Sequence, residues 1–413
     1  MKFLYNTLIK SFHVLLPILG LFFKRLKVFY LDRKNTSAEF NAFVDKNQNL
    51  IIWTHVASLG EYEQVVPVLQ NLKKKYPNYT YLISFFSDSG YRNKKNRSIA
   101  DFETYLPLDT PKQARDFVNQ VNPSLAIFVK YDIWPNFLME LNQRNIKTFL
   151  ISARFRPHQI YFKYYGAFFR RSVFSFTHIF LQDQASGHLL NSIGYTRWTI
   201  SGDTRYDRVA LQLEQNNTLA FVDNFVQDRP CMVCGSTWPE GEKILIPLIN
   251  DTSVNLKYII APHQIDEKAI EGLETRIKKP CIRFSRILDN EISHYEVIII
   301  DNVGMLTKIY AYANLAYVGG AMGKTGLHNI LEPAAFGVPI CIGPHHKNFP
   351  EAKALEDFGG LKVVSHEKEL KTFVKKILED QKLLNAMSTA SRKFIDNQKG
   401  ATNIIVEKIK ETI

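Results

Sequence analysis

The sequence predicts two α/β domains, each built on a parallel, doubly wound sheet, behind an apolar N-terminal helix. Short apolar runs alternate with helical patterns along most of the chain, as in parallel sheets whose strands are joined by helices. A length of 413 residues is enough for two large cores. A polar stretch at 209–230 separates two such alternating sets and is the expected linker. We therefore expect the domains at 35–208 and 231–413, and consider that the final helix packs back on the first domain.

The predicted strands are short, apolar and bounded by turn residues. In the first domain they lie at 50–55, 79–84, 104–108, 125–130, 147–152, 178–182 and 199–200. In the second domain they lie at 231–234, 257–261, 297–300, 316–318, 340–342 and 361–364. Helices are expected at 61–75, 111–120 and 132–145, and 87–97 reads as a basic loop. Ligands bind beyond the carboxyl ends of the strands in such sheets, so we expect a cleft between the two facing carboxyl edges.

The first 34 residues are expected to anchor the chain to a membrane. An uncharged apolar run covers 11–23, and basic residues follow it directly. Anionic lipids of the cytoplasmic leaflet attract such residues, which favours the inner face of a membrane. The run is shorter than the roughly 18–20 residues of a spanning helix, and no A-x-A cleavage site follows it. Spanning the membrane, lying in its interface and packing as a buried helix all remain open.

Composition and motifs narrow the classes of function. The net charge of +12 suits an anionic partner, such as nucleic acid, an anionic membrane or a phosphorylated substrate. Four scattered cysteines exclude a disulfide framework, and Cys231 and Cys234 are expected to be buried in a strand rather than to bind metal. The chain has neither a P-loop motif nor a strand–GxGxxG–helix fingerprint, which argues against P-loop NTPases and dinucleotide oxidoreductases.

Charged residues follow the predicted strands of the first domain at their carboxyl ends. Glu61 comes after strand 50–55, Asp132 after 125–130, Arg154 after 147–152 and Arg205 after the strand ending at residue 200. Two carboxylates and two arginines at one edge suit a general base with charge-stabilising partners. The alternative is structural: Asp132 as a helix N-cap and Glu61 as a first-turn acid.

The segment 156–180 mixes basic and aromatic side chains. This pattern suits stacking on nucleic-acid bases, and equally the headgroup boundary of a membrane. The predicted anchor makes a membrane or an anionic lipid substrate the more economical interpretation. A helix with a core-facing aromatic stripe remains an alternative.

The stretch 316–351 has the pattern of an anion-binding site. An apolar strand runs into two glycines, and a glycine-bearing loop leads to a short helix with Asn329 and Glu332 in its first turn. Backbone N–H groups at such a loop bind phosphate, and a carboxylate there accepts hydrogen bonds from ribose hydroxyls. A nucleotide or nucleotide-sugar site and an ordinary strand–helix–strand unit both fit this stretch.

Taken in order, these and other short motifs resemble the Kdo (3-deoxy-D-manno-octulosonic acid) transferases of lipopolysaccharide biosynthesis. The motifs are HVASLGE at 55–61, DIWPN at 132–136, AR at 153–154, GDTRYD at 202–207, GST at 235–237, PH at 262–263, VGM at 303–305, GG at 319–320, HNILEP at 328–333, GPH at 343–345 and NF at 348–349. The chain departs from the family pattern at several positions. Asp132 stands in place of Glu, Arg205 in place of Lys, and Trp238 where His is common.

The resemblance implies a glycosyltransferase B-type fold, with two Rossmann-like domains facing across a cleft. It implies metal-free, cofactor-free, inverting transfer of Kdo from CMP-Kdo to a lipid A precursor (lipid IVA) at the cytoplasmic face of the inner membrane. Glu61 matches the general base, and Asp132 and Arg205 match positions that stabilise the transition state. The positions implied to contact CMP are Pro262, His263, Val303, Gly304, Met305, Asn329, Ile330, Leu331 and Glu332. Additional candidates in the matching motifs are Ser58, Gly60, Arg154, Ser236 and Thr237.

Two alternatives stay open beside this hypothesis. The first is another B-fold glycosyltransferase, or a nucleotide-sugar epimerase, that uses the same nucleotide site. The second, more remote, is a membrane-anchored nucleic-acid-binding protein, based on the net charge and segment 156–180; a nucleic-acid partner is not expected. The number of Kdo residues added, the acyl-chain preference and the oligomeric state do not follow from the sequence.

Overall fold

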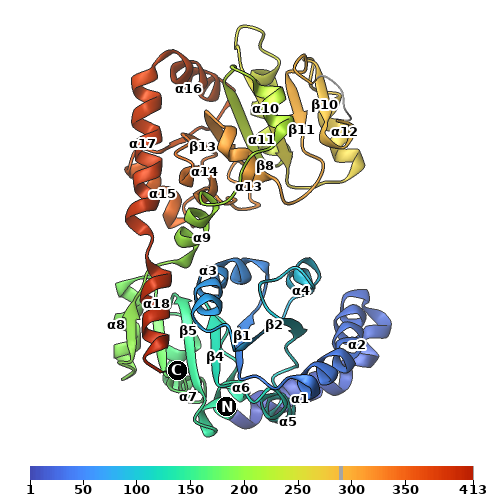
Figure 1. Ribbon diagram of the computed structural model, residues 1–413, viewed down its shortest axis with the longest axis vertical. Coiled ribbons are helices and arrows are strands. Elements are labelled where there is room, and N and C mark those ends of the chain that lie inside the picture. The colour runs from blue at the N-terminus through green and yellow to red at the C-terminus, as the bar shows by residue number, and fades with distance from the viewer. Residues whose placement is uncertain (288–291, 413) are drawn as a thin grey trace. The chain divides into compact units, whose positions relative to one another are not determined.

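The computed structural model describes residues 1–287 and 292–412. The chain divides into two compact units, one formed by Met1–Arg208 together with Lys399–Ile413 and the other by Val209–Gln398. Each unit contains one parallel sheet of seven strands flanked by helices, as the alternating pattern predicts (Figure 1). The two-domain α/β architecture predicted from the sequence is therefore confirmed.

The first unit has the strand order β3-β2-β1-β4-β5-β6-β7, with every neighbouring pair parallel. The order reverses between β1 and β4, which makes this pair the switch point of a doubly wound sheet. The strands are β1 (Ile51–Val56), β2 (Thr80–Phe85), β3 (Phe102–Tyr105), β4 (Leu125–Val129), β5 (Lys147–Ala153), β6 (His178–Leu181) and β7 (Trp198–Ile200).

Helices cover both faces of this sheet because successive strand residues point to opposite faces. Ile51 and Trp53 of β1 pack in the core under α5 (Pro111–Val121) and α6 (Pro135–Gln143), whereas Ile52 packs in the core under α3 (Leu59–Lys75) and α18 (Ala401–Lys410). The helices of the first unit are α3 (Leu59–Lys75), α4 (Asp88–Lys94), α5 (Pro111–Val121), α6 (Pro135–Gln143), α7 (Ala167–Phe174), α8 (Gln184–Ser192), the beginning of α9 (Thr204–Gln212) and α18 (Ala401–Lys410). The 87–97 segment, expected to be a loop, contains α4, whose N-cap Ser87 accepts a hydrogen bond from the Gly90 amide.

The second unit has the order β10-β11-β9-β8-β12-β13-β14, again fully parallel, with its switch point between β8 and β12. Its strands are β8 (Cys231–Thr237), β9 (Lys257–Pro262), β10 (Cys281–Arg283), β11 (Val297–Ile299), β12 (Leu315–Val318), β13 (Ile340–Ile342) and β14 (Leu361–Val363). Its helices are α10 (Ala220–Val226), α11 (Pro239–Ile249), α12 (Glu267–Glu274), α13 (Leu306–Ile309), α14 (Leu331–Ala335), α15 (Pro350–Asp357), α16 (Glu367–Glu379) and α17 (Gln381–Gln398).

The cysteines of β8 are buried and free, as expected of strand cysteines, and desolvation raises the pKa of the Cys231 thiol to about 12.

The C-terminal helix α18 belongs to the first unit, where it packs on α3. Asp207 caps this helix: its carboxylate accepts hydrogen bonds from the Gly400 amide at 2.6 Å and from the Thr402 amide at 2.8 Å. The Thr402 hydroxyl donates a third bond at 2.9 Å. A single side chain therefore joins the segment that leaves the first unit to the segment that returns to it.

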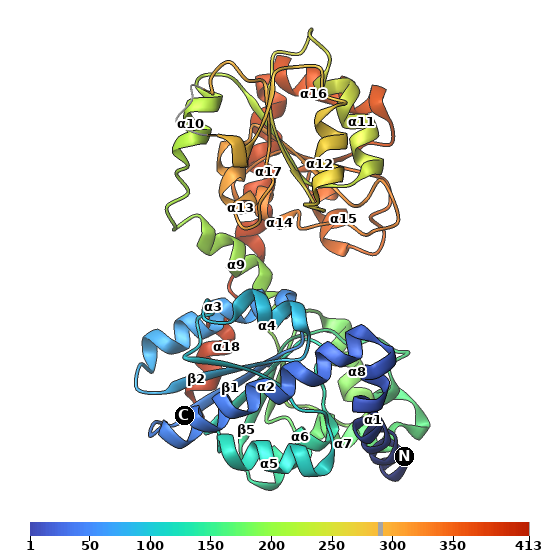
Figure 2. The same ribbon diagram turned by 90° about the vertical axis from the view of Figure 1, so that its right-hand side faces the viewer.

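The N-terminal segment forms two helices, α1 (Lys2–Phe22) and α2 (Lys24–Lys46), which lie side by side on the first unit (Figure 2). The Tyr5 hydroxyl donates a 2.6 Å hydrogen bond to Asp109, and the Asn136 amide group donates one of 2.9 Å to Asn6. The opposite face of α1 is apolar and exposed, and comprises Phe3, Leu4, Leu8, Val14, Leu15, Ile18, Leu21 and Phe22. The alternative of a buried N-terminal helix is therefore wrong.

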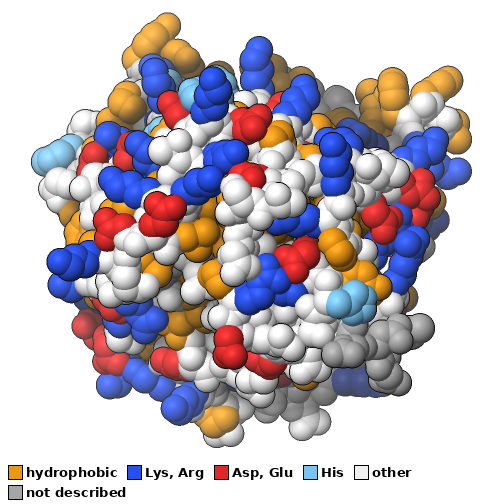
Figure 3. Space-filling model, turned by 90° about the horizontal axis from the view of Figure 1, so that it is seen from above, with side chains coloured by type: hydrophobic (Ala, Val, Ile, Leu, Met, Phe, Trp, Pro, Cys, Tyr) orange, Lys and Arg blue, Asp and Glu red, His pale blue; other side chains and the backbone are white. Residues whose placement is uncertain are grey.

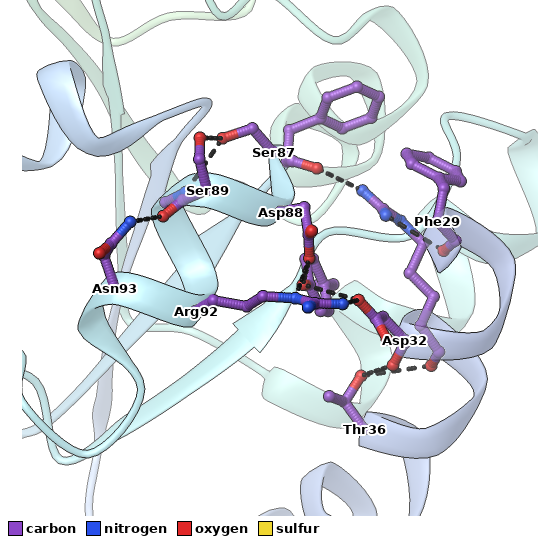
Figure 4. Close-up of polar contacts among 12 residues, drawn as sticks. Phe29, Asp32, Thr36, Ser87, Asp88, Ser89, Arg92 and Asn93 are labelled. Carbon is purple, nitrogen blue, oxygen red and sulfur yellow. Dashed lines mark hydrogen bonds and ion pairs between the residues drawn. The ribbon is translucent and has the colours of Figure 1, made fainter. Parts of the chain in front are cut away.

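Helix α2 is fixed to α4 by charged side chains (Figure 4). The Arg92 guanidinium lies between Asp32 and Asp88, at 2.9 Å and 2.7 Å from their carboxylate oxygens. Arg33 donates to the Phe86 carbonyl at 2.6 Å, and its guanidinium carbon lies 3.5 Å from the centre of the Phe29 ring. Burial lowers the pKa of Arg33 to about 10. These contacts hold the N-terminal helices against the segment that follows β2.

Candidate functional site

The candidate base Glu61 lies at the N-terminus of α3, directly after β1. It is in the first turn, as expected, with Ser58 as the N-cap residue and Gly60 exposed beside it. The Ser58 hydroxyl donates a hydrogen bond to one oxygen of Glu61, and the other oxygen lies 3.7 Å from the ammonium nitrogen of Lys130. The Glu61 side chain is 17% exposed, so it is accessible to a ligand while held on both sides.

Asp132 follows β4, the strand next to β1, so the switch point of the sheet brings it close to Glu61. The side chain is 12% exposed, and its Oδ2 atom has no hydrogen-bond partner among the described residues. Desolvation, and secondly the negative charge of Glu61, raise the pKa of Asp132 to about 7. A hydrogen bond with the Ala57 backbone and the Lys130 charge act in the opposite direction. A carboxyl with this pKa is protonated and unprotonated in comparable amounts near neutral pH.

The structural alternative for Asp132, a helix N-cap, is wrong. Helix α6 begins at Pro135 rather than at 132, and its N-cap position is Trp134. The first amides of α6 are satisfied by Asp109, which accepts bonds of 3.1 Å from both the Asn136 and the Phe137 N–H. Asp132 therefore makes no contribution to capping α6, and its burial beside a second carboxylate costs stability.

The buried side chain of His55 contacts the loop that carries Asp132. His55 is fully buried, and desolvation lowers its pKa to about 3, so the ring is neutral. Its Nε2 atom accepts a hydrogen bond of 3.0 Å from the Trp134 indole, and Nδ1 therefore carries the proton and donates to the Ser84 carbonyl at 3.0 Å. The same Nε2 atom lies 3.9 Å from Asp132. This chain of contacts fixes the position of the loop that carries Asp132.

Both predicted arginines of the first unit are paired with neighbouring aspartates. Arg154 follows β5 and lies 2.9 Å from the carboxylate of Asp183. Arg205 is in the first turn of α9 and lies 2.8 Å from the carboxylate of Asp203, which is only 9% exposed. The pairing holds each guanidinium in a defined orientation.

In the second unit, β8 and β12 end at the switch point, where the candidates Ser236 and Thr237 lie. Both belong to β8, which extends to Thr237 and not only to residue 234 as predicted; they do not lie at a helix start. Ser236 has a positive φ of 51°, and a Cβ on Gly319, after β12, would lie only 2.0 Å from the Ser236 carbonyl oxygen. A glycine at 319 therefore allows the two strand ends to approach each other.

Asn329 and Glu332 form a hydrogen-bonded pair near this edge. The Asn329 amide group donates to Glu332 at 2.9 Å, and Thr307 of α13 donates to the other carboxylate oxygen at 3.0 Å. Through Thr307, the pair is linked to α13, the helix that follows the 303–305 loop. Asn329 precedes α14, which has five residues, so the expected helical first turn containing both residues is wrong; Glu332 alone lies in the first turn.

The remaining candidates for CMP contact differ in exposure. Val303 is 82% exposed and Gly304, with a φ of 99°, is exposed beside it, whereas Met305 is half-buried. Ile330 and Leu331 are each 1% exposed, so only their backbone groups are available to a ligand.

Aromatic side chains stack beside the end of β9. Pro262 is the last residue of β9 and His263 is exposed after it. The Trp238 ring stacks on His263 with centres 4.6 Å apart, and its indole N–H donates to Nε2 of His328 at 2.9 Å. Desolvation, and secondly the charge of His263, lower the pKa of His328 to about 4. The tryptophan that departs from the family pattern thus joins two segments of the predicted site.

Lys130 and Thr307 are the site residues that sequence reasoning missed. Lys130 is the residue directly after β4, and its position at a strand end two residues before Asp132 was the available signal. Thr307 lies inside a helical pattern, where nothing in the sequence separates it from other surface residues.

Positive and negative side chains are mixed on the face of the molecule that Figure 3 shows. Lys and Arg side chains there are interspersed with Asp and Glu. This face offers no uniform basic surface of the kind that tracks a nucleic-acid backbone.

Comparison with known proteins points to one family. The family described as 3-deoxy-D-manno-octulosonic-acid transferase (kdotransferase) matches residues 27–208. The 3-deoxy-D-manno-octulosonic acid transferase of Haemophilus influenzae is 28% identical over 377 residues, covering 87% of this chain and 86% of that protein. The protein of the same name from Chlamydophila psittaci is 27% identical, covering 71% of this chain and 70% of its own.

The fold is shared more widely. A UDP-GlcNAc 2-epimerase from Neisseria meningitidis, solved with UDP-GlcNAc, has a TM-score of 0.64 at 15% identity and covers 88% of this chain and 100% of its own. This likeness concerns the fold alone, and it agrees with the predicted glycosyltransferase B-type architecture. The family match over residues 27–208 and the relatives that span both units are more specific, and they support membership of the Kdo transferase family, a family of glycosyltransferases.

Proposed function

We propose that the chain transfers Kdo from CMP-Kdo to a hydroxyl group of the lipid A precursor lipid IVA, in lipopolysaccharide biosynthesis. The observation that carries this proposal is the convergence of Glu61, Lys130 and Asp132 at the switch point of the first sheet, in a chain that matches the Kdo transferase family. A partly exposed carboxylate held by a hydroxyl and an ammonium group has the properties of a general base.

In the proposed reaction, Glu61 accepts the proton of the acceptor hydroxyl as its oxygen attacks the anomeric carbon of Kdo. The bond from that carbon to the CMP phosphate oxygen breaks, and CMP leaves with the electron pair. A single displacement of this kind inverts the anomeric configuration. The leaving group is an anion already stable at neutral pH, so no acid is needed to protonate it.

Asp132 and Arg205 are the proposed stabilisers of the transition state. With a pKa of about 7, the Asp132 side chain can donate a hydrogen bond when it is protonated and can stabilise a positive charge when it is ionised. Arg205, oriented by Asp203, supplies a fixed positive charge. The resemblance of these positions to the family motifs supports the assignment.

The proposed cytidylate site lies in the second unit and uses the segments 262–263, 303–305 and 329–332. Glu332 is the proposed acceptor for ribose hydroxyls, since its carboxylate is already oriented by Asn329 and Thr307. Helices α13 and α14 have only four and five residues, so neither has a long helix dipole. We therefore propose that backbone N–H groups of the loops that precede these helices donate hydrogen bonds to the phosphate of CMP.

We propose that α1 lies in the interface of the inner membrane at its cytoplasmic face. Its length and composition would suffice to cross a membrane. Its polar contacts to Asp109 and Asn136, however, hold one face on the protein and leave the apolar face outward. Flotation with anionic vesicles tests this. The double variant Leu8→Glu/Ile18→Glu should no longer bind the vesicles and should stay in the bottom fraction. Unchanged flotation of the variant would exclude the interface role of α1.

The test of the transfer reaction is incubation of the purified protein with CMP-Kdo and lipid IVA, followed by mass spectrometry of the lipid. A mass increase by one or more Kdo residues supports the proposal and counts the sugars. A matched incubation with UDP-GlcNAc separates this activity from the first alternative. Transfer or epimerisation of the UDP-sugar, without use of CMP-Kdo, would overturn the donor assignment.

A further inference from the structure

We propose that Lys130 is a positioning residue that holds Glu61 in its ionised, base-competent form against the repulsion of Asp132. This inference rests on the proposed function, because it assigns to Lys130 a role toward the proposed base. Neither the family motifs nor the strand pattern singled Lys130 out.

The backbone at Lys130 is the first observation. Its φ is 64°, in the left-handed region that residues other than glycine seldom adopt. Such a conformation is strained and persists where the surroundings determine it. The Lys130 amide donates to the Ile151 carbonyl at 2.9 Å, so pairing with β5 fixes this turn.

The surroundings of the ammonium group are the second observation. The Lys130 nitrogen lies 3.7 Å from Glu61, and the lysine side chain is 26% exposed, so water screens the pair only in part. Lys130 has no other ion pair among the described residues. Its nitrogen lies 6.0 Å from the centre of the Tyr131 ring, at the outer limit of a cation–π contact.

The charges around Glu61 make a counterion necessary. Asp132 on the β4–α6 loop is a second carboxylate close enough to interact with Glu61. His55 beneath is neutral, and Tyr161, whose pKa burial raises to about 12, is also neutral. Among the described residues, Lys130 is the cation within ion-pair distance of Glu61. Without it, the negative charge of Glu61 would face that of Asp132 with no counterion at ion-pair distance.

The experiment compares the wild type with Lys130→Met, which keeps the length of the side chain and removes its charge. Lys130→Arg is the conservative variant, and Lys147→Met, at the exposed opposite end of β5, is the matched control. The acidic limb of the kcat–pH profile should move up by roughly one pH unit in Lys130→Met, since an opposite charge at this distance is worth about 1–3 units. At a pH on that limb, kcat falls roughly tenfold and recovers at higher pH, with KM unchanged. Lys130→Arg should restore the wild-type profile.

A titration independent of catalysis separates this inference from the proposed function. In protein labelled with ¹³C at the Glu carboxyls, the Glu61 resonance is assigned by its loss in Glu61→Gln. Its titration midpoint should rise by roughly one pH unit in Lys130→Met and stay in place in Lys147→Met. An unmoved midpoint overturns the inference, as does a higher KM at constant kcat, which would make Lys130 a substrate contact. Absence of Kdo transfer by the wild type would refute the proposed function, and the midpoint would still decide the role of Lys130.

Discussion

Replacing Asp132 by Asn should stabilise the protein at neutral and alkaline pH. The carboxyl has a pKa of about 7 in the folded chain, against an ordinary value of 3.8. The folded state therefore binds the proton more tightly than the unfolded state, and stability is lost as the pH rises from about 4 to about 7. Above that window both states are ionised and the folded state carries the full cost of a buried charge. An amide carries no charge at any of these pH values.

The magnitude follows from the size of the pKa change. Each pH unit corresponds to 1.36 kcal/mol, so the gain of Asp132→Asn should grow by about 2–3 kcal/mol between pH 5 and pH 8. For a unit of this size, that increment corresponds to roughly 5–10 °C in Tm. The amide oxygen of Asn can keep the hydrogen bond with the Ala57 backbone, and the site loses only its charge.

Calorimetry of the wild type and Asp132→Asn at pH 5 and pH 8 measures the effect on the first unit. Asp116→Asn is the matched control, because Asp116 lies on α5 with its side chain 49% exposed. The control should change Tm little, and by the same amount at both pH values. An equal Tm change at pH 5 and pH 8 in Asp132→Asn, or a loss of stability at pH 8, would refute the reasoning. The variant should also be impaired in transfer, as expected where a functional group is kept at the expense of stability.

Two further predictions concern the N-terminal helix and the second unit. Tyr5→Phe keeps the ring contacts with Phe168 and Phe169 but removes the hydrogen bond to Asp109. Amide hydrogen exchange in α1 should therefore accelerate while the strands of the first unit stay protected. Unchanged exchange in α1 would contradict the role of this bond in holding α1 on the first unit. Gly319→Ala forces a Cβ to 2.0 Å from a backbone oxygen and should weaken CMP binding at least tenfold in calorimetric titration. Gly272→Ala in α12 meets no atom within 4 Å and is its control; equal CMP affinity in both variants would exclude a role for the 319 contact.

The fold was predictable because its signals are local and repeated. A strand such as β1 is a run of apolar residues before a Ser-Leu-Gly turn, and the same pattern recurs around both sheets. Strand β10 was missed because it has three residues, among them an arginine, at the edge of its sheet. Apolar periodicity is weak in so short an edge strand. The basic segment 87–97 was predicted as a loop because its Ser and Gly residues have poor helix propensity. It forms α4 because the Ser87 cap outweighs that propensity.

The candidate site was predictable in part. Residues at strand ends, such as Glu61 and Asp132, are brought together by the topology of a parallel sheet, which the alternation of strands and helices already implies. Contacts that depend on tertiary structure were not predictable. Asp109 caps α6 from a loop 27 residues before Asn136, and Trp238 contacts His328 across 90 residues of sequence. Such pairs leave no periodic signal in a single sequence.

The central claim is that Glu61 accepts the proton of the acceptor hydroxyl, and Glu61→Gln tests it most directly. The variant keeps the shape of the side chain and its contact with Ser58 but cannot act as a base at neutral pH. Single-turnover transfer from CMP-Kdo to lipid IVA should fall at least a hundredfold, the ordinary contribution of general base catalysis being about 10²–10⁴-fold. CMP affinity, measured by calorimetric titration, should stay unchanged. Transfer by Glu61→Gln at the wild-type rate would contradict the claim.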